Sequence, residues 1–268
     1  IQYSCNAGAA YTSETVDKTA FYSMLKNFGF GAPTGLPMAG ESIGLLRTPE
    51  NWSYRSKPTI AIGQEVSVTA VQMITAATAL ANNGVLLKPH IIKKIVSPEG
   101  EIIQENNRTE VRKVLSETVA KNMLMMMEAS TEPEGTASRA TIEGISIAAK
   151  TGTAEMLDRE TGKYSEKGFV PSCLALFPAE DPEFIVYVVI VHPKAGEYYG
   201  GRIAAPIIKQ VNNELIRYYG IPRNEDVVAE HPGEITLISK KPISVEDTLP
   251  DLTGLSKREL LPLFKKQD

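Results

Sequence analysis

Apolar residues recur at helical spacing in four stretches of this chain, and each stretch predicts a helix. The first lies within residues 1–30 and ends at two glycines, and the second starts at a cap formed by Ser67 or Thr69. The third covers about 116–130 after a serine cap, and the fourth is a long amphipathic helix from about 201 to 220. The methionines of the third helix are expected to fill the core.

Strand patterns occur in two regions. Residues 85–104 predict two short strands joined by a turn at 98–101. Residues 142–157 and 168–193 carry the other strand signals, of which the apolar run 184–191 is the clearest. Because this run is apolar at consecutive positions, it predicts a central strand that is covered on both faces.

Other segments lack this periodicity. Residues 29–60 are rich in glycine and proline, which predicts a long irregular segment of a kind that often serves function. Residues 223–247 are charged and interrupted by prolines, as in a linker, with one short strand at 235–238. Residues 248–268 begin a separate unit, with a helix expected from about Ser256.

Composition narrows the class of protein. With 268 residues, 43% of them hydrophobic and 22% charged, the chain has the composition of a folded globular protein with a substantial core. Its net charge of −4 argues against a nucleic-acid partner held through phosphate contacts. No apolar run approaches the roughly 20 residues of a membrane span. The chain starts at Ile1 without a signal-like segment, so we expect a processed chain or a fragment.

The cysteines and histidines predict neither a disulfide framework nor a metal site. There are two cysteines and three well-separated histidines, with no CxxC or HExxH spacing. We therefore expect no metal and no cofactor. A disulfide between Cys5 and Cys173 is conceivable and is not favoured.

Two short motifs combine residue types that suit acyl transfer. Lys150–Thr153 reads Lys-Thr-Gly-Thr within a predicted strand, and Ser4–Asn6 reads Ser-Cys-Asn. Such a strand beside a cleft offers a cation, hydroxyls for a carboxylate, and a glycine that keeps the groove open. Its edge can pair with an extended peptide, and an exposed N–H can polarise an acyl carbonyl. Ser-x-Asn adds a hydroxyl for proton relay and an amide that orients substrate.

Each motif alone also has an ordinary structural interpretation. Ser4–Asn6 would serve equally as a helix cap, and Lys150 as a solvated surface lysine. Motifs this short also arise by chance in chains of this length. Their order and surroundings carry the functional interpretation.

The order resembles that of serine enzymes that recognise D-Ala-D-Ala or penicillins. These use Ser-x-x-Lys, then Ser-x-Asn, then Lys-Thr-Gly, and the last two stand here in that order. Over about residues 1–220 the chain is similar to the class B penicillin-binding proteins, which are peptidoglycan D,D-transpeptidases. Further segments that carry the resemblance are Phe28–Gly31, Thr34–Gly35, Gly40–Glu41, Ile60–Gln64, Val68–Gln72, Ala81–Gly84, Lys88–Pro89, Phe177–Pro182 and Tyr198–Pro206.

The resemblance implies an α/β fold of the penicillin-binding-protein and serine β-lactamase type. Its central antiparallel sheet has five strands with helices on both faces, and this chain would be N-terminally incomplete. We expect residues 1–222 to form the transpeptidase domain without its nucleophile segment. The linker 223–247 would lead to 248–268, which resembles the start of a PASTA module.

By matched position, the resemblance also implies a role for each motif residue. Ser4 would relay a proton to the leaving amine, Asn6 would hold the amide of the acyl side chain, and Lys150 would keep the site electropositive. The N–H of Thr153 would form half of an oxyanion hole. The residues implied to bind substrate are Thr151, Gly152 and Thr153.

The family's nucleophile motif should precede Ser4, where only three residues stand. The one Ser-x-x-Lys of the chain, Ser23–Lys26, follows Ser-x-Asn instead, and we interpret it as a helix surface. Loss of a nucleophile from a comparable site costs on the order of 10⁶ in rate. We therefore expect that this chain alone is not acylated by penicillin.

The implied function is cross-linking of peptidoglycan stem peptides that end in D-Ala-D-Ala, with a septal role in division. The expected partners are these stem peptides, β-lactams bound to the intact enzyme, and cell-wall synthesis or division proteins, but no nucleic acid. The expected location is the extracytoplasmic face of the cytoplasmic membrane, with an anchor outside this chain. Two alternatives stay open: a non-catalytic module that binds stem peptide or docks division proteins, and a penicillin-hydrolysing or penicillin-sensing relative.

Overall fold

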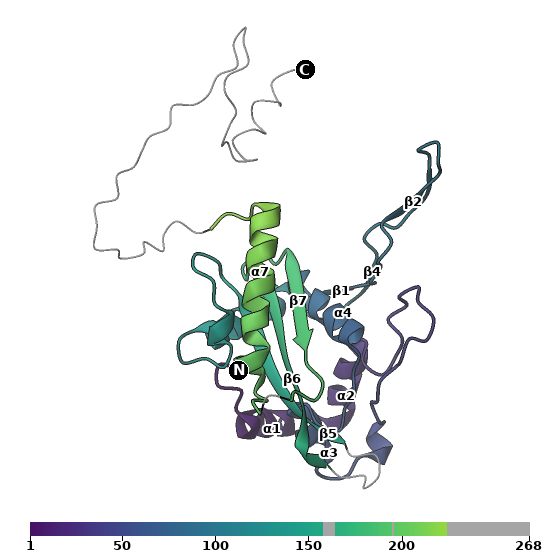
Figure 1. The fold of residues 1–268 in the computed structure, drawn as a ribbon. Coiled ribbons are helices and arrows are strands. Elements are labelled where there is room, and N and C mark those ends of the chain that lie inside the picture. Colours follow the sequence, from purple (N-terminus) through teal and green to yellow (C-terminus); the bar gives the residue numbers. More distant parts are fainter. Residues whose placement is uncertain (158–163, 195, 224–268) are drawn as a thin grey trace, which may run out of the picture.

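The computed structural model describes residues 1–157, 164–194 and 196–223 (Figure 1). The expected linker and PASTA-like module lie outside the described residues, except for Arg223. The helices are α1 (Asn6–Glu14), α2 (Lys18–Asn27), α3 (Ser56–Ala61), α4 (Ala70–Ala81), α5 (Glu117–Glu128), α6 (Gly200–Ile203) and α7 (Ala205–Tyr219), with 3-10 turns at Pro49–Asn51, Ala129–Thr131 and Ser138–Ala140. The strands are β1 (Val85–Leu87), β2 (Lys94–Val96), β3 (Ile102–Glu105), β4 (Glu110–Lys113), β5 (Ala148–Leu157), β6 (Tyr164–Phe177) and β7 (Phe184–Val189).

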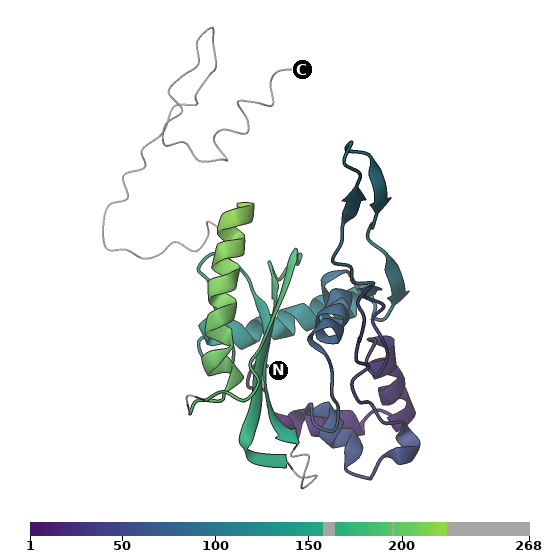
Figure 2. The ribbon, with the colours of Figure 1, turned by 45° about the vertical axis from the view of Figure 1, so that its right-hand side comes forward.

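A three-stranded antiparallel sheet in the order β5-β6-β7 forms the centre of the molecule. Helix α7 covers one face of this sheet, and α4 and α5 pack on the other face (Figure 2). Alternate residues of β6 pack into the helix layers on the two faces of the sheet, because successive side chains along a strand point to opposite faces. Cys173 and Ala175 are buried on the α7 side, and Leu176 is buried on the α4 and α5 side. Helices on both faces of an antiparallel sheet confirm the predicted α/β class.

The prediction for 184–191 is confirmed for the two covered faces of the strand and is wrong for its central position within the described sheet. The strand β7 ends at Val189 and lies at the edge of the described sheet, and β6 is the central strand. Both α4 and α7 pack against β7, so the apolar pattern of this strand indicates that both of its faces are covered. Such a pattern does not indicate whether a strand lies at the centre or at the edge of the sheet. The described sheet has three strands, as expected of an N-terminally incomplete form of the five-stranded sheet that the resemblance implies.

Side-chain caps set the helix boundaries. Residues 1–30 form two helices, because Asp17 accepts hydrogen bonds from two backbone N–H groups of the next turn (2.8 and 3.1 Å) and so starts α2. Thr69, and not Ser67, caps α4, in a reciprocal capping box with Gln72. The third helix has the serine cap that was predicted.

Residues 85–104 contribute to three short strands, β1, β2 and β3, instead of the predicted pair. The strands β2 and β3 form the expected hairpin, whereas β1 pairs with β4 at 110–113, whose wholly exposed residues lack an apolar pattern. Together they form an arm that projects from the body (Figure 2). The expectation that the α5 methionines fill the core holds for Met127, which is 5% exposed, and is wrong for Met126, which is 46% exposed.

Candidate active site

Strand β5 presents Lys150–Thr153 along an edge of the sheet, because its one described strand partner is β6. Gly152 lies opposite Ser172, and a Cβ added at Gly152 would lie 2.7 Å from the Ser172 Oγ. A residue with a Cβ at this position would therefore require the Ser172 hydroxyl to turn away. The other edge of β5 leaves backbone groups that can pair with an added peptide.

The N-terminal motif and the β5 motif meet at Ser4 and Lys150, which are 146 residues apart. The Lys150 Nζ donates hydrogen bonds to the Ser4 Oγ at 2.6 Å and to the Thr151 carbonyl at 2.7 Å. Ser4 has a φ of +50°, a left-handed backbone that is costly for a residue with a side chain. Residues are held in such conformations where surrounding structure imposes them, often at functional sites.

A cavity of about 1000 Å³ opens beside this pair of residues. The predicted site residues all line it: Ser4, Asn6, Lys150, Thr151, Gly152 and Thr153. The other lining residues are Ile62, Gln64, Thr136, Ser138, Arg139, Glu155, Phe169, Tyr198, Tyr199, Gly201 and Arg202. The cavity is therefore large enough for a peptide end, and its wall is mostly polar.

Burial lowers the pKa of Lys150, because removal of water disfavours the charged ammonium. The neighbouring Cys173 has a smaller, opposite influence. Burial raises the pKa of the Cys173 thiol itself to about 12, so near neutral pH this thiol is uncharged and the desolvation of Lys150 prevails. A lysine with a lowered pKa can exchange a proton with the Ser4 hydroxyl that it contacts.

The helix-cap interpretation of Ser4–Asn6 holds alongside the site interpretation. Cys5 is the N-cap of α1, where its Sγ accepts a hydrogen bond from the Gly8 N–H at 3.3 Å. Asn6 is the first residue of that helix and lines the cavity. Cys5 is exposed, Cys173 is buried, and both are free thiols, so the conceivable disulfide is not formed.

Sequence reasoning missed the wall of the cavity that precedes α7. The Gly200 N–H donates a hydrogen bond to the Thr153 Oγ1 at 3.1 Å, and the rings of Phe169 and Tyr198 stack at 4.1 Å. A signal lies in the Tyr-Tyr-Gly-Gly run at 198–201, whose glycines permit a close backbone approach. The resemblance assigns this run only to closure of the domain.

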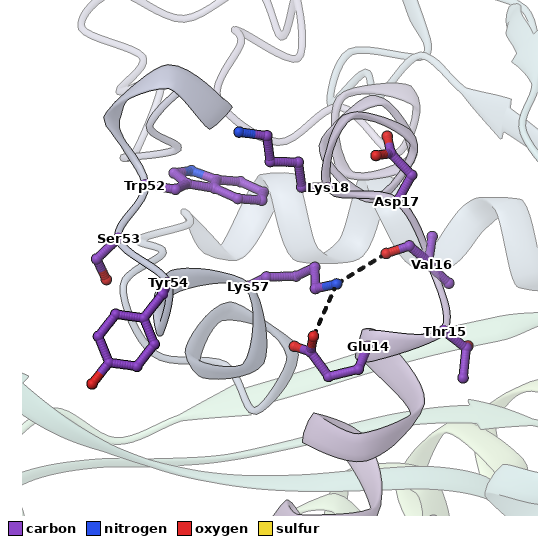
Figure 3. A pocket seen from close by; sticks show the side chains of 9 residues that line it. All are labelled: Glu14, Thr15, Val16, Asp17, Lys18, Trp52, Ser53, Tyr54 and Lys57. Carbon is purple, nitrogen blue, oxygen red and sulfur yellow. Dashed lines mark hydrogen bonds and ion pairs between the residues drawn. The ribbon is translucent and has the colours of Figure 1, made fainter.

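A second cavity, of about 620 Å³, lies between the α1–α2 junction and the start of α3 (Figure 3). Lys57 reaches across it, donating a hydrogen bond to the Val16 carbonyl at 3.0 Å and pairing with Glu14 at 3.3 Å. This cavity shares no lining residue with the first. Because its most buried charge is already paired, we interpret it as a structural junction.

The Ser-x-x-Lys at Ser23–Lys26 lies in α2 and lines neither cavity. Its lysine donates a hydrogen bond to the Gly31 carbonyl at 3.1 Å, which ties the helix end to the following loop. Within the described ranges, no cluster of three or more His, Cys, Asp or Glu residues could hold a metal ion. No helix in the same ranges combines the length and apolarity of a membrane span.

The cavity, the half-buried Lys150 and the edge strand together form a candidate site of the kind that serine acyl-transfer enzymes use. The family model "Penicillin binding protein transpeptidase domain" matches residues 1–213. The chain belongs to this family.

Similar proteins are longer than this chain. Stage V sporulation protein D of Bacillus subtilis (strain 168) is 32% identical over 257 residues, which cover 95% of this chain and 39% of that protein. Penicillin-binding protein PbpB of Mycolicibacterium smegmatis is 31% identical over 230 residues, which cover 83% of this chain and 35% of that protein. The crystal structure of penicillin-binding protein 3 from Mycobacterium tuberculosis with ampicillin matches with a TM-score of 0.77 and 28% identity, over 84% of this chain and 51% of that one. The chain thus spans less than two fifths of these curated relatives.

Proposed function

We propose that the protein containing this chain is a serine-type peptidoglycan D,D-transpeptidase, acting on stem peptides that end in D-Ala-D-Ala. The contact of 2.6 Å between the Lys150 Nζ and the Ser4 Oγ, beside an edge strand and inside one cavity, carries the proposal. A relative from Neisseria gonorrhoeae, 29% identical, is named a probable peptidoglycan D,D-transpeptidase.

The hydrogen bonds of the site suggest how its hydroxyls act. The Ser4 Oγ accepts from Lys150, so its own hydrogen is free to point into the cavity. The Thr153 Oγ1 likewise accepts from Gly200, which leaves its hydrogen for a substrate carboxylate. Thr151, which is 9% exposed, is the second hydroxyl of this carboxylate subsite.

In the proposed reaction, the terminal carboxylate binds at Thr151 and Thr153, and the scissile carbonyl accepts a hydrogen bond from the Thr153 N–H. A serine supplied from outside these 268 residues attacks that carbonyl and forms an acyl ester. The D-Ala amine leaves with a proton that passes through the Ser4 hydroxyl, whose partner is Lys150. An amine of a second stem peptide then attacks the ester and completes the cross-link.

The wider biology follows from the relatives and is part of the proposal. The same subsites would hold the carboxylate and the acyl carbonyl of a β-lactam, and the similar Mycobacterium tuberculosis protein was crystallised with ampicillin. The names of relatives, among them FtsI and a sporulation protein, support wall synthesis in division or sporulation, outside the cytoplasmic membrane. Docking to division proteins and a PASTA-like module at 248–268 belong to the same proposal.

Labelling with fluorescent penicillin tests the function. The full-length protein should form a stable covalent adduct, and residues 1–268 alone should not. In the full-length protein, Lys150→Met should slow acylation by about 10²–10⁴, the usual contribution of proton transfer. The control Lys121→Met removes an exposed lysine that pairs with Glu117 on the same helix, and it should label like the wild type. Absence of labelling in the full-length protein would instead favour a non-catalytic module.

A further inference from the structure

Glu155 places a negative charge in the lining of the cavity. Of the described residues that line this cavity, it is the only carboxylate, beside Lys150, Arg139 and Arg202. Arg202 pairs with Glu197, outside the lining. Within the described part of the chain Glu155 is exposed and makes no hydrogen bond or ion pair, so its carboxylate is free to meet a ligand.

The strand geometry places Glu155 in line with the carboxylate subsite. Thr151, Thr153 and Glu155 alternate along β5 and therefore share one face. At about 3.4 Å per residue, Glu155 stands about 7 Å beyond Thr153 along the strand. In the other direction Ala148 and Ala149 are fully buried and do not line the cavity. A peptide whose terminal carboxylate sits at the threonines must therefore run past Glu155.

We infer that Glu155 selects acyl-donor stem peptides that carry a free amino group on the side chain preceding D-Ala-D-Ala. This inference rests on the proposed function. Cross-linking needs an amine on the acceptor stem, and since stems are chemically alike, the donor carries the same amine. A carboxylate at the edge strand, beside the incoming peptide, is placed to bind that group as an ammonium.

The chemistry favours the donor amine over the acceptor amine as the ligand. An acceptor amine must be neutral in order to attack the ester. A nearby carboxylate stabilises the protonated form of an amine and would oppose that attack. Glu155 therefore suits an ammonium that is held and does not react.

Single-turnover acylation of the full-length protein tests the inference. The two donors are acetylated peptides ending in L-Lys-D-Ala-D-lactate, one with a free lysine and one with Nε-acetyl-lysine, and mass spectrometry measures the acyl-enzyme. The wild type should prefer the free amine by about threefold to fivefold, as expected of an exposed ion pair. Glu155→Gln should abolish this preference, and Glu155→Lys should reverse it. Added salt should reduce it, because exposed pairs are screened.

Glu143→Gln is the matched control, since Glu143 is exposed and lies outside the cavity lining. It should keep the wild-type preference. Equal acylation by both donors, or a preference that survives Glu155→Gln, would overturn the inference and leave the proposed function standing. An effect of Glu155→Gln confined to the later attack by an acceptor amine would also overturn it. Acylation by neither donor would count against the proposed function itself.

Discussion

Gly200 is a position where one added methyl group should disturb the candidate site. It begins α6, and a Cβ added there would lie 2.3 Å from the Gly152 carbonyl oxygen and 2.4 Å from that of Ser172. Real Cβ atoms essentially never approach closer than 3.0 Å, so in Gly200→Ala the start of α6 must retreat by about 0.7 Å. The two oxygens belong to neighbouring strands, so neither can move away without deforming the sheet.

The retreat has two costs. Overpacking of a close-packed region costs about 1–3 kcal/mol. Loss of the hydrogen bond from the Gly200 N–H to the Thr153 Oγ1 adds about 1 kcal/mol. At roughly 2–4 °C per kcal/mol for a domain of this size, the unfolding midpoint of the transpeptidase domain should fall by at least about 4 °C. Acylation by penicillin should slow as well, because Thr153 loses the group that orients its hydroxyl.

Gly8→Ala provides the control. A Cβ at Gly8 would make only ordinary contacts, the nearest at 3.6 Å with the Cys5 Sγ. Gly8 lies inside α1, where alanine is favoured over glycine by about 0.5–1 kcal/mol, so this variant should be as stable as the wild type or slightly more stable. Scanning calorimetry of both variants checks the comparison. If Gly200→Ala unfolds within 1 °C of the wild type, the close packing of α6 on β5 and β6 is refuted.

Other predictions concern the core, a helix cap and the buried thiol. Leu86→Ala should destabilise the protein by about 2–4 kcal/mol in urea unfolding, because Leu86 is 2% exposed, whereas Ile103→Ala, at 67% exposed, should change it by less than about 0.5 kcal/mol. Thr69→Ala should cost about 1 kcal/mol by removing the capping box of α4, and Thr69→Ser should restore most of it in the same assay. With the pKa of Cys173 raised from 9.0 to about 12, the unfolded chain releases the thiol proton first, so this thiol should lower stability as pH rises from 9 towards 12; a pH slope that Cys173→Ala leaves unchanged would contradict this. Iodoacetamide should alkylate Cys5 and spare Cys173 in the folded protein, as peptide mass mapping would show.

Local hydrogen bonding made much of the secondary structure predictable. Helix caps depend on residues that are near neighbours in the chain, so the residue types alone predict them. Examples are the caps at Thr69 and Ser116 and the left-handed Gly220 after α7. Apolar spacing likewise located the helices. It was less reliable for faces: within the predicted stripe of α7, Ile208 and Ile216 are buried, whereas Tyr219 is 60% exposed.

The pairing of strands across the sheet could not be predicted from apolar spacing. An apolar run is the same at the centre or the edge of a sheet when helices cover both of its faces, so β7 was misplaced. Exposed strands such as β4 carry no burial pattern at all. In both cases the deciding contact is a backbone hydrogen bond to a distant segment. The periodicity of side chains carries no information about such a bond.

The candidate site shows the same division. Two motifs in the chain indicated which chemical groups to expect, because the order of Ser-x-Asn and Lys-Thr-Gly and the segments around them resemble those of one enzyme family. Their contact across 146 residues, the burial that lowers the pKa of Lys150, and the line from Thr151 to Glu155 along one cavity all arise from packing. Residue types specify the available groups, but distance and dielectric surroundings exist only once remote segments are brought together.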